Sequence, residues 1–124
     1  MAITRNHQAE YSHWRPEEVR IIDDVPVRFS DVCVYEFTLN DVDDVEIYAA
    51  APIWEWQQSE AGAWVMEHAI KKPYWVQFMD TYSYGYKIRI MARLSDKDQT
   101  FWRLKWAGRH MQKLLTLRML KSLE

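Results

Sequence analysis

The sequence predicts an α+β fold with a small antiparallel sheet and helices packed on one face. Three observations lead there: two segments alternate apolar and polar residues like strands, a segment between them has helical end signals, and a capping sequence follows the last strand. The 124 residues (15.0 kDa) suffice for one core. We divide the chain into an N-terminal arm (1–24), an α+β domain (25–107) and a C-terminal helix (108–124).

The first regular element follows a polar arm. Residues 1–24 have no clear period and contain Pro16, so we interpret them as an arm. Residues 25–40, V-P-V-R-F-S-D-V-C-V-Y-E-F-T-L-N, are rich in β-branched and aromatic side chains and predict a strand. Its alternation places these four side chains on one face: Cys33, Tyr35, Phe37 and Leu39.

A helical region follows the strand. The acidic run after Asn40 can cap a helix and supply carboxylates to its first turn, so the helix is expected to begin near residue 43 or 44. Proline belongs in the first turn of a helix and disrupts its interior. We therefore expect a short helix (44–50) and a main helix (52–70) that begins at Pro52 and ends before Lys71-Lys72-Pro73.

Two antiparallel strands are predicted next, over residues 74–81 and 84–94, joined around Tyr82-Ser83. The second alternates cleanly. Tyr84, Tyr86, Ile88, Ile90 and Ala92 share one face, and Lys87, Arg89, Met91 and Arg93 share the other. One face is therefore expected to join the core, and the other to meet water or a partner.

The segment after the last strand predicts a helix over residues 99–107. Ser95-Asp-Lys-Asp98 resembles a capping box, with two carboxylates in the first turn. A strand over 100–106 is the alternative, because T-F-W-R-L-K-W also alternates. With either element the order resembles the β-α-β-β-α of a ferredoxin-like plait whose last strand is missing or supplied late.

The C-terminal segment predicts a second helix whose apolar residues surround its axis. They are Met111, Leu114, Leu115, Leu117, Met119, Leu120 and Leu123. Such a helix needs burial on several sides, more than a small monomer offers at its end. We therefore expect self-association, with Leu114, Leu117 and Leu120 as contact residues.

The charge is divided unevenly along the chain. Residues 1–70 carry four Lys/Arg and fourteen Asp/Glu, a charge of −10, whereas residues 71–124 carry twelve and four, a charge of +8. The halves can attract each other inside one fold or between copies, or the basic half can meet a polyanion. Nucleic acid is therefore an alternative partner of residues 71–113, through Lys87, Arg89, Arg93, Arg103 and Lys105, with Trp75 and Tyr82 as stacking rings.

Motifs for catalysis are missing from the sequence. The four histidines have no metal-ligand spacing, and three glycines leave no room for a phosphate loop. The single cysteine, Cys33, is expected to be a buried, inert thiol. We therefore predict no enzymatic activity, metal, cofactor or small-molecule substrate. No apolar run resembles a signal peptide or a membrane span, so a cytoplasmic location is expected.

Tryptophans in the stretch I-W-E-W-Q-Q-S-E-A-G-A-W-V-M-E-H-A-I (53–70) are candidates for partner binding. On a helical wheel, Trp56 shares a face with small residues, which suits packing on a sheet. Trp54 and Trp64 fall outside that face. Aromatic side chains are enriched at protein interfaces, so these two tryptophans are predicted to contact a partner.

Two segments carry a family resemblance. E-W-Q-Q-S-E-A-G-A-W-V-M-E-H-A (55–69) and D-Q-T-F-W-R-L-K-W (98–106) resemble short uncharacterised proteins of tailed bacteriophages, cyanophages in particular. The resemblance covers residues 44–107 and implies a small α+β domain of phage origin without any stated activity. It implies a virion or assembly component or, alternatively, an early protein that binds and modulates a host complex. The expected location is the cytoplasm of the infected bacterium or the virion.

Overall fold

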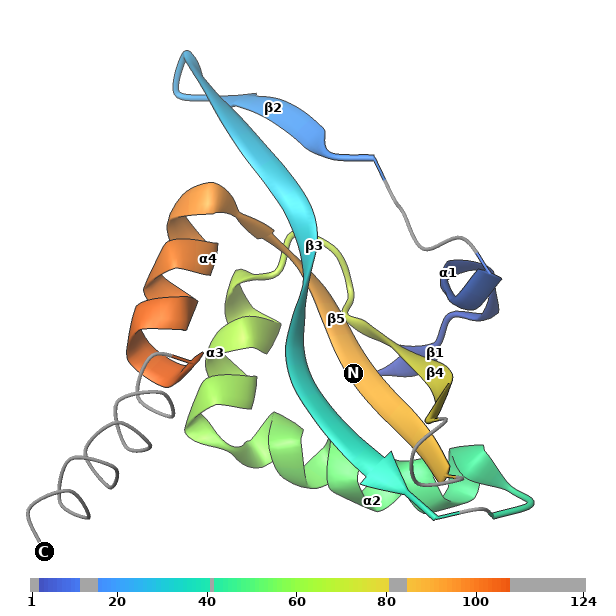
Figure 1. Ribbon diagram of the computed structural model, residues 1–124. Coiled ribbons are helices and arrows are strands. Elements are labelled where there is room, and N and C mark those ends of the chain that lie inside the picture. The colour runs from blue at the N-terminus through green and yellow to red at the C-terminus, as the bar shows by residue number, and fades with distance from the viewer. Residues whose placement is uncertain (1–2, 12–15, 41, 81–84, 108–124) are drawn as a thin grey trace, which may run out of the picture.

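The computed structural model describes residues 3–11, 16–40, 42–80 and 85–107 and shows an α+β fold built on a five-stranded mixed sheet (Figure 1). The strand order across the sheet is β1-β4-β5-β3-β2. The strands are β1 (Thr4–Arg5), β2 (Glu18–Ile22), β3 (Val25–Leu39), β4 (Tyr74–Asp80) and β5 (Gly85–Ser95). The sequence predicted an antiparallel sheet. The observed sheet is mixed, because β1 pairs with β4 in parallel.

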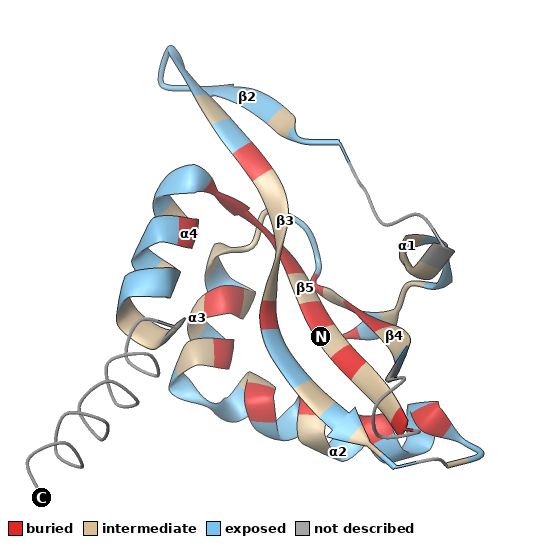
Figure 2. Cartoon of the chain, in the orientation of Figure 1, coloured by how far each residue is buried: buried red, intermediate tan, exposed pale blue. Residues whose placement is uncertain are grey.

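The central strand β5 alternates as its sequence predicts. Ile88, Ile90 and Ala92 are fully buried beneath the helices, and β5 carries a row of buried positions in Figure 2. Arg89 and Met91 line a hollow on the opposite face of the sheet, which we call the open face. The neighbours β3 and β4 both pair with β5 in antiparallel register. The three predicted strands are therefore confirmed.

One residue of β3 interrupts its alternation. The register against β5 shifts between Cys33 and Tyr35: Cys33 faces Met91, and Tyr35 faces Ile90. Val34 is the extra residue of this bulge, and its side chain is buried in the core. The prediction that Cys33 shares a face with Tyr35 is therefore wrong, because a bulge moves the residues before it to the other face.

The helical region breaks at a different residue from the one expected. α2 (Val45–Gln58) contains Pro52 in its interior, and α3 (Glu60–His68) begins after Ser59. The Ser59 hydroxyl accepts a hydrogen bond from the Gly62 amide (3.1 Å) and donates one to the Trp56 carbonyl (2.5 Å). This cap ends one helix and starts the next, so the expected break before Pro52 is wrong.

Residues after β5 are helical, so the helix prediction is confirmed over the strand alternative. α4 (Asp96–Trp102) continues into a π-helical turn, η1 (Arg103–Ala107). The Ser95 hydroxyl accepts a hydrogen bond from the Asp98 amide at 3.1 Å, which is the cap that the sequence indicates. The predicted C-terminal helix (108–124) lies outside the described residues.

The segment interpreted as an arm contributes to both edges of the sheet. β1 lies beside β4 and leads into α1 (His7–Tyr11), while β2 pairs with β3. β2 and β3 are joined by Asp23-Asp24, both with positive φ (51° and 65°), as in a type I′ hairpin turn. The sheet thereby gains a strand at each edge.

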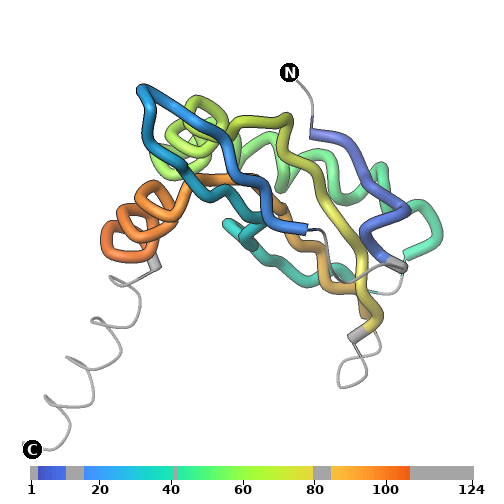
Figure 3. The backbone as a smooth tube through the Cα atoms, turned by 90° about the horizontal axis from the view of Figure 1, so that it is seen from above, coloured from blue at the N-terminus to red at the C-terminus, as the bar shows by residue number. Residues whose placement is uncertain are grey.

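The core lies between the sheet and the layer formed by α2 and α3, which run along one face of the sheet (Figure 3). It contains apolar residues of β3, β4, β5, α2 and α3, together with Ile3 just before β1. Within the described residues, no helix reaches the length and apolar character that a membrane crossing requires.

Candidate protein-interaction surface

The outer side of α2 exposes a row of apolar residues. The buried side of this helix carries Val45, Ala49, Ile53 and Trp56. On the opposite side, Trp54 is 61% exposed and Ile47 is 69% exposed. We call Ile47, Tyr48, Ala51 and Trp54 the α2 stripe. The sequence analysis found Trp54 but missed Ile47 and Tyr48, although positions 47, 51 and 54 have the spacing of one helix face.

A groove of about 600 Å³ lies beside Trp54. Its apolar walls come from α2, from β4 and from the residue before β1, through Ile3, Ala50, Ile53, Trp54 and Trp75. Near it, Arg5 binds Glu46 at 3.0 Å, and this hydrogen bond lowers the pKa of Glu46. Arg5 also binds Glu10 at 2.7 Å, so the guanidinium ties α1 to α2. The groove is therefore apolar inside and has an ion pair at its rim.

Trp64 lies in a different environment from Trp54. Its ring stacks on His68 (centroids 4.2 Å apart) and Phe101 (5.3 Å), and it contacts Trp106 at 5.4 Å. The cluster joins α3 to α4 and η1. Trp64 is half-buried, so most of its contact area already serves the packing of these helices.

The hairpin of β2 and β3 is a second exposed apolar surface, and it extends beyond the helical layer (Figure 1). We define the hairpin tip as Val19, Ile21, Ile22 and Val25, all of which are exposed, with Ile21 at 70%. Alternation places Val19 and Ile21 on one face of the hairpin and Ile22 and Val25 on the other. The sequence analysis missed this surface, because residues 18–22 were interpreted as part of an arm.

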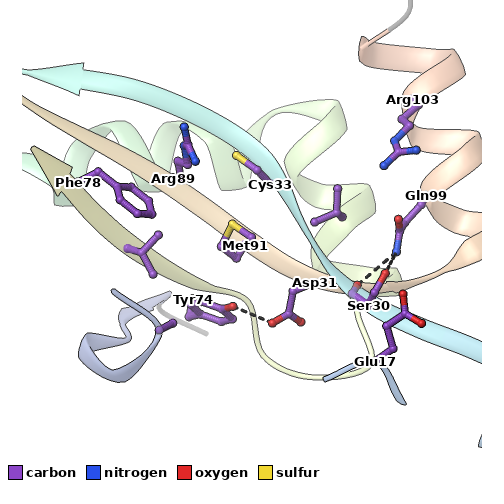
Figure 4. Close-up of a pocket in the computed structure, with 13 residues that line it drawn as sticks. Glu17, Ser30, Asp31, Cys33, Tyr74, Phe78, Arg89, Met91, Gln99 and Arg103 are labelled. Carbon is purple, nitrogen blue, oxygen red and sulfur yellow. Dashed lines mark hydrogen bonds between the residues drawn. The ribbon is translucent and has the colours of Figure 1, made fainter. Parts of the chain in front are cut away.

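The open face of the sheet holds a hollow of about 500 Å³ (Figure 4). Cys33, Met91 and Phe78 line its middle. At one side the Tyr74 hydroxyl donates a hydrogen bond to Asp31 (2.8 Å). Burial raises the pKa of the Cys33 thiol, which disfavours the reactive thiolate. Among the described residues, no group of three or more His, Cys, Asp or Glu side chains could hold a metal ion.

Most of the basic side chains proposed as nucleic-acid contacts form ion pairs within the fold. Arg93 is only 6% exposed, and Trp75 is 4% exposed in the core, so little of either side chain is accessible to a phosphate or a base. Arg103 lines the open-face hollow. The other ion pairs join Arg89 to Glu36 (2.9 Å), Lys87 to Glu36 (3.5 Å), Lys105 to Glu60 (3.3 Å) and Lys71 to Glu18 (3.2 Å). The acidic and basic halves of the sequence thus pair inside one fold.

Acid stability is expected to depend on Glu18. Hydrogen bonds from Arg20, Lys71 and Arg93 lower the pKa of this carboxyl from 4.5 to about 2. A lowered folded-state pKa stabilises the fold above pH 4.5, and the contribution is lost as the pH falls from 4.5 to about 2. Glu18→Gln is therefore expected to reduce the fall in melting temperature over this range, as followed by circular dichroism.

Glu17→Gln is the matched control for this experiment, because Glu17 lies one residue away in an exposed pair with Arg28 (3.4 Å). Its melting temperature is expected to fall with pH as that of the wild type does. Equal pH dependence of Glu18→Gln and the wild type would contradict the role of Glu18.

The remaining predicted contact residues, Leu114, Leu117 and Leu120, lie outside the described residues. Comparison of the chain with protein-family models, curated proteins and solved structures finds no match in any of the three. Functional inference therefore depends on the exposed surfaces and on their chemistry.

Proposed function

We propose that this chain is a non-enzymatic, protein-binding component that forms oligomers. The observation that carries the proposal is the exposure of large apolar side chains in two groups, the α2 stripe and the hairpin tip. Scattered apolar residues are normal on a protein surface, but adjacent ones, such as Ile47, Ala51 and Trp54 along one side of α2, indicate an interaction site. Two separate surfaces suit a protein that contacts more than one neighbour.

The biological setting is taken from the resemblance to phage proteins. We place the chain as a virion or assembly component in the cytoplasm of an infected bacterium or in the virion. Repeated contacts between unlike surfaces build rings or filaments, and the hairpin tip and α2 stripe are two unlike surfaces. The alternative is an early protein that binds a host complex through one of them. Native mass spectrometry separates the roles, since a large defined assembly supports the first and a stable small species supports the second.

We also propose a topology for the sheet. We interpret the strand order β4-β5-β3-β2 as a ferredoxin-like plait in which β2 occupies the place of the last strand. The antiparallel pairing of β2 with β3 supports this interpretation. Residues 108–124 are proposed to form an apolar helix outside this domain.

The proposal predicts a concentration-dependent oligomer of the full chain in light scattering. Ile47→Ser in the α2 stripe and Ile21→Ser in the hairpin tip are each expected to shift the population to smaller species. Both side chains are exposed, so the melting temperature is expected to stay within about 2 °C of the wild type.

Met79→Ser is the matched control, because Met79 is an exposed apolar residue on β4 that lies outside both surfaces. This variant is expected to associate as the wild type does. A chain that stays monomeric at every concentration would overturn the proposed function. Equal effects of all three substitutions would show that the α2 stripe and the hairpin tip are not the surfaces through which the chain associates.

A further inference from the structure

We propose that the α2 stripe and the groove beside Trp54 bind residues 108–124 of a second copy of this chain. The inference rests on the proposed oligomer-forming function and names the two surfaces that meet. The α2 stripe is a row of apolar residues on one side of a 14-residue helix, hollowed beside Trp54 by an apolar groove. Such a surface fits an apolar helix laid along it.

Charge favours the same pairing. Residues 42–70, which include α2 and α3, contain six Asp/Glu and no Lys or Arg. Residues 108–124 contain four Lys/Arg and a single carboxylate side chain, Glu124. Glu55 is exposed next to Trp54, and Asp43 and Asp44 are exposed before the first turn of α2. The stripe is thus an apolar row with acidic neighbours, and the C-terminal segment is an apolar sequence with interspersed cations.

The length of α2 also matches that of residues 108–124. A helix rises about 1.5 Å per residue, so α2 is about 21 Å long and a helical 108–124 segment would be about 25 Å long. The segment follows η1 directly, which packs on α4 and, through Trp106, on Trp64 of α3. The last described residue, Ala107, therefore lies at the end of η1 beside α3 and α4.

The occupant is assigned to a second copy because of how the apolar residues of the segment are distributed. They surround the predicted helix axis, so docking on one α2 stripe within the same chain would cover only one side. In a two-fold pair, each C-terminal helix can meet the stripe of the other copy on one side and the second C-terminal helix on another. In that isologous arrangement the pair buries two α2 stripes and two C-terminal segments, one of each from each copy.

Cysteine cross-linking of the full chain tests the contact. In a Cys33→Ser background, Ala51→Cys on the stripe and Leu117→Cys in the segment are combined in one chain. Isotopically light and heavy protein are mixed in denaturant, refolded together and oxidised. Disulfides form only where the Cα atoms come within about 7 Å. Mass spectrometry is expected to find mixed-isotope pairs between the peptides that contain residues 51 and 117.

The control variant combines Leu117→Cys with Lys97→Cys, an exposed position on α4, and is expected to give no such pairs. Pairs of one isotope only would show that the segment docks on its own chain and would overturn the inference. An oligomer in light scattering without pairs between 51 and 117 would overturn the inference and leave the proposed function standing. A strictly monomeric chain would overturn both.

A second measurement quantifies the role of the stripe. Trp54→Ala is expected to weaken the self-association constant at least about tenfold, as truncation of a central interface tryptophan does. Leu104→Ala removes a more exposed apolar side chain from η1 and is expected to change the constant less than about threefold. Equal constants for Trp54→Ala and the wild type would overturn the inference.

Discussion

Gly62→Ala is expected to destabilise the fold by about 3 kcal/mol, because the corner between α2 and α3 has no space for a side chain. A Cβ atom at this position would lie 1.8 Å from the Trp56 carbonyl oxygen and 2.7 Å from its carbonyl carbon. Both are backbone atoms, so no rotamer change can relieve the clash. The corner would have to open, and the Ser59 cap on the Gly62 amide would be strained with it.

Thermal and urea unfolding measure this effect, and the melting temperature is expected to fall by about 10 °C. The matched control is Ala63→Gly, which changes an exposed position one residue along the same helix. It removes a Cβ atom and is expected to cost about 1 kcal/mol through helix propensity alone. If Gly62→Ala cost no more than Ala63→Gly, the close approach at the corner would be refuted.

The parts of the fold that depend on local patterns could be predicted from the sequence. The alternation of β5 is visible because its apolar residues are two apart and face one layer of helices. The start of α4 is visible because Ser95 and the carboxylates after it act within one turn. Each of these features is settled by residues within a few positions of each other.

Pro52 illustrates where local rules failed. A proline inside a helix removes one hydrogen bond, and the rule that it belongs in the first turn placed the break before it. α2 tolerates Pro52, because packing of Ile53 and Trp56 in the core outweighs the lost bond. The break occurs at Ser59, where a hydroxyl caps α3. The sequence Ser59-Glu60 was a usable signal, since it has the same cap and first-turn acid as Ser95-Asp96.

Long-range pairing explains the other misses. β2 is a short strand whose partner and turn decide its structure, and the turn uses Asp23-Asp24 where glycine or asparagine is the usual signal. The bulge at Val34 leaves no mark on the alternation around it. The uneven charge was visible in the sequence, but the pairing of particular residues depends on the sheet register that brings them together.

The candidate site was predictable only in part, for a related reason. Trp54 and Trp64 look alike on a wheel for a single helix, since both fall outside the face of Trp56. The corner at Ser59 puts them on two helices, so Trp54 is exposed while Trp64 packs against Phe101 of α4. The position of the helix break at Ser59 therefore decides which of the two tryptophans is exposed to a partner.

Arg93→Met is expected to destabilise the protein by about 3–5 kcal/mol, the cost of removing one member of a buried ion pair. The side chain of Arg93 is 6% exposed, and its Nε donates to Asp31 at 2.8 Å. The remaining nitrogens donate to Glu18 (3.1 Å) and to the Pro16 carbonyl (3.0 Å). Methionine fills much of the same space but cannot donate a hydrogen bond to any of these acceptors.

The same guanidinium holds the start of β2 against the sheet, since Glu18 is the first residue of β2 and Pro16 lies two residues before it. Arg93→Met is therefore also expected to speed proteolysis near residues 16–22. Arg89→Met is the matched control: Arg89 faces the same side of β5, but its pair with Glu36 is exposed and is expected to contribute about 0.5 kcal/mol.

Adding Asp31→Asn to Arg93→Met tests the cause of the loss. The second substitution removes the buried carboxylate that has lost the Arg93 guanidinium and keeps a group that can accept the Tyr74 hydroxyl, so it is expected to recover part of the stability. Urea unfolding gives the free energies, and limited trypsin digestion gives the local effect. A loss no larger than that of Arg89→Met would show that the buried network does not hold the sheet edge. If the double variant were less stable than Arg93→Met, the buried charge of Asp31 would not be the cause of the loss.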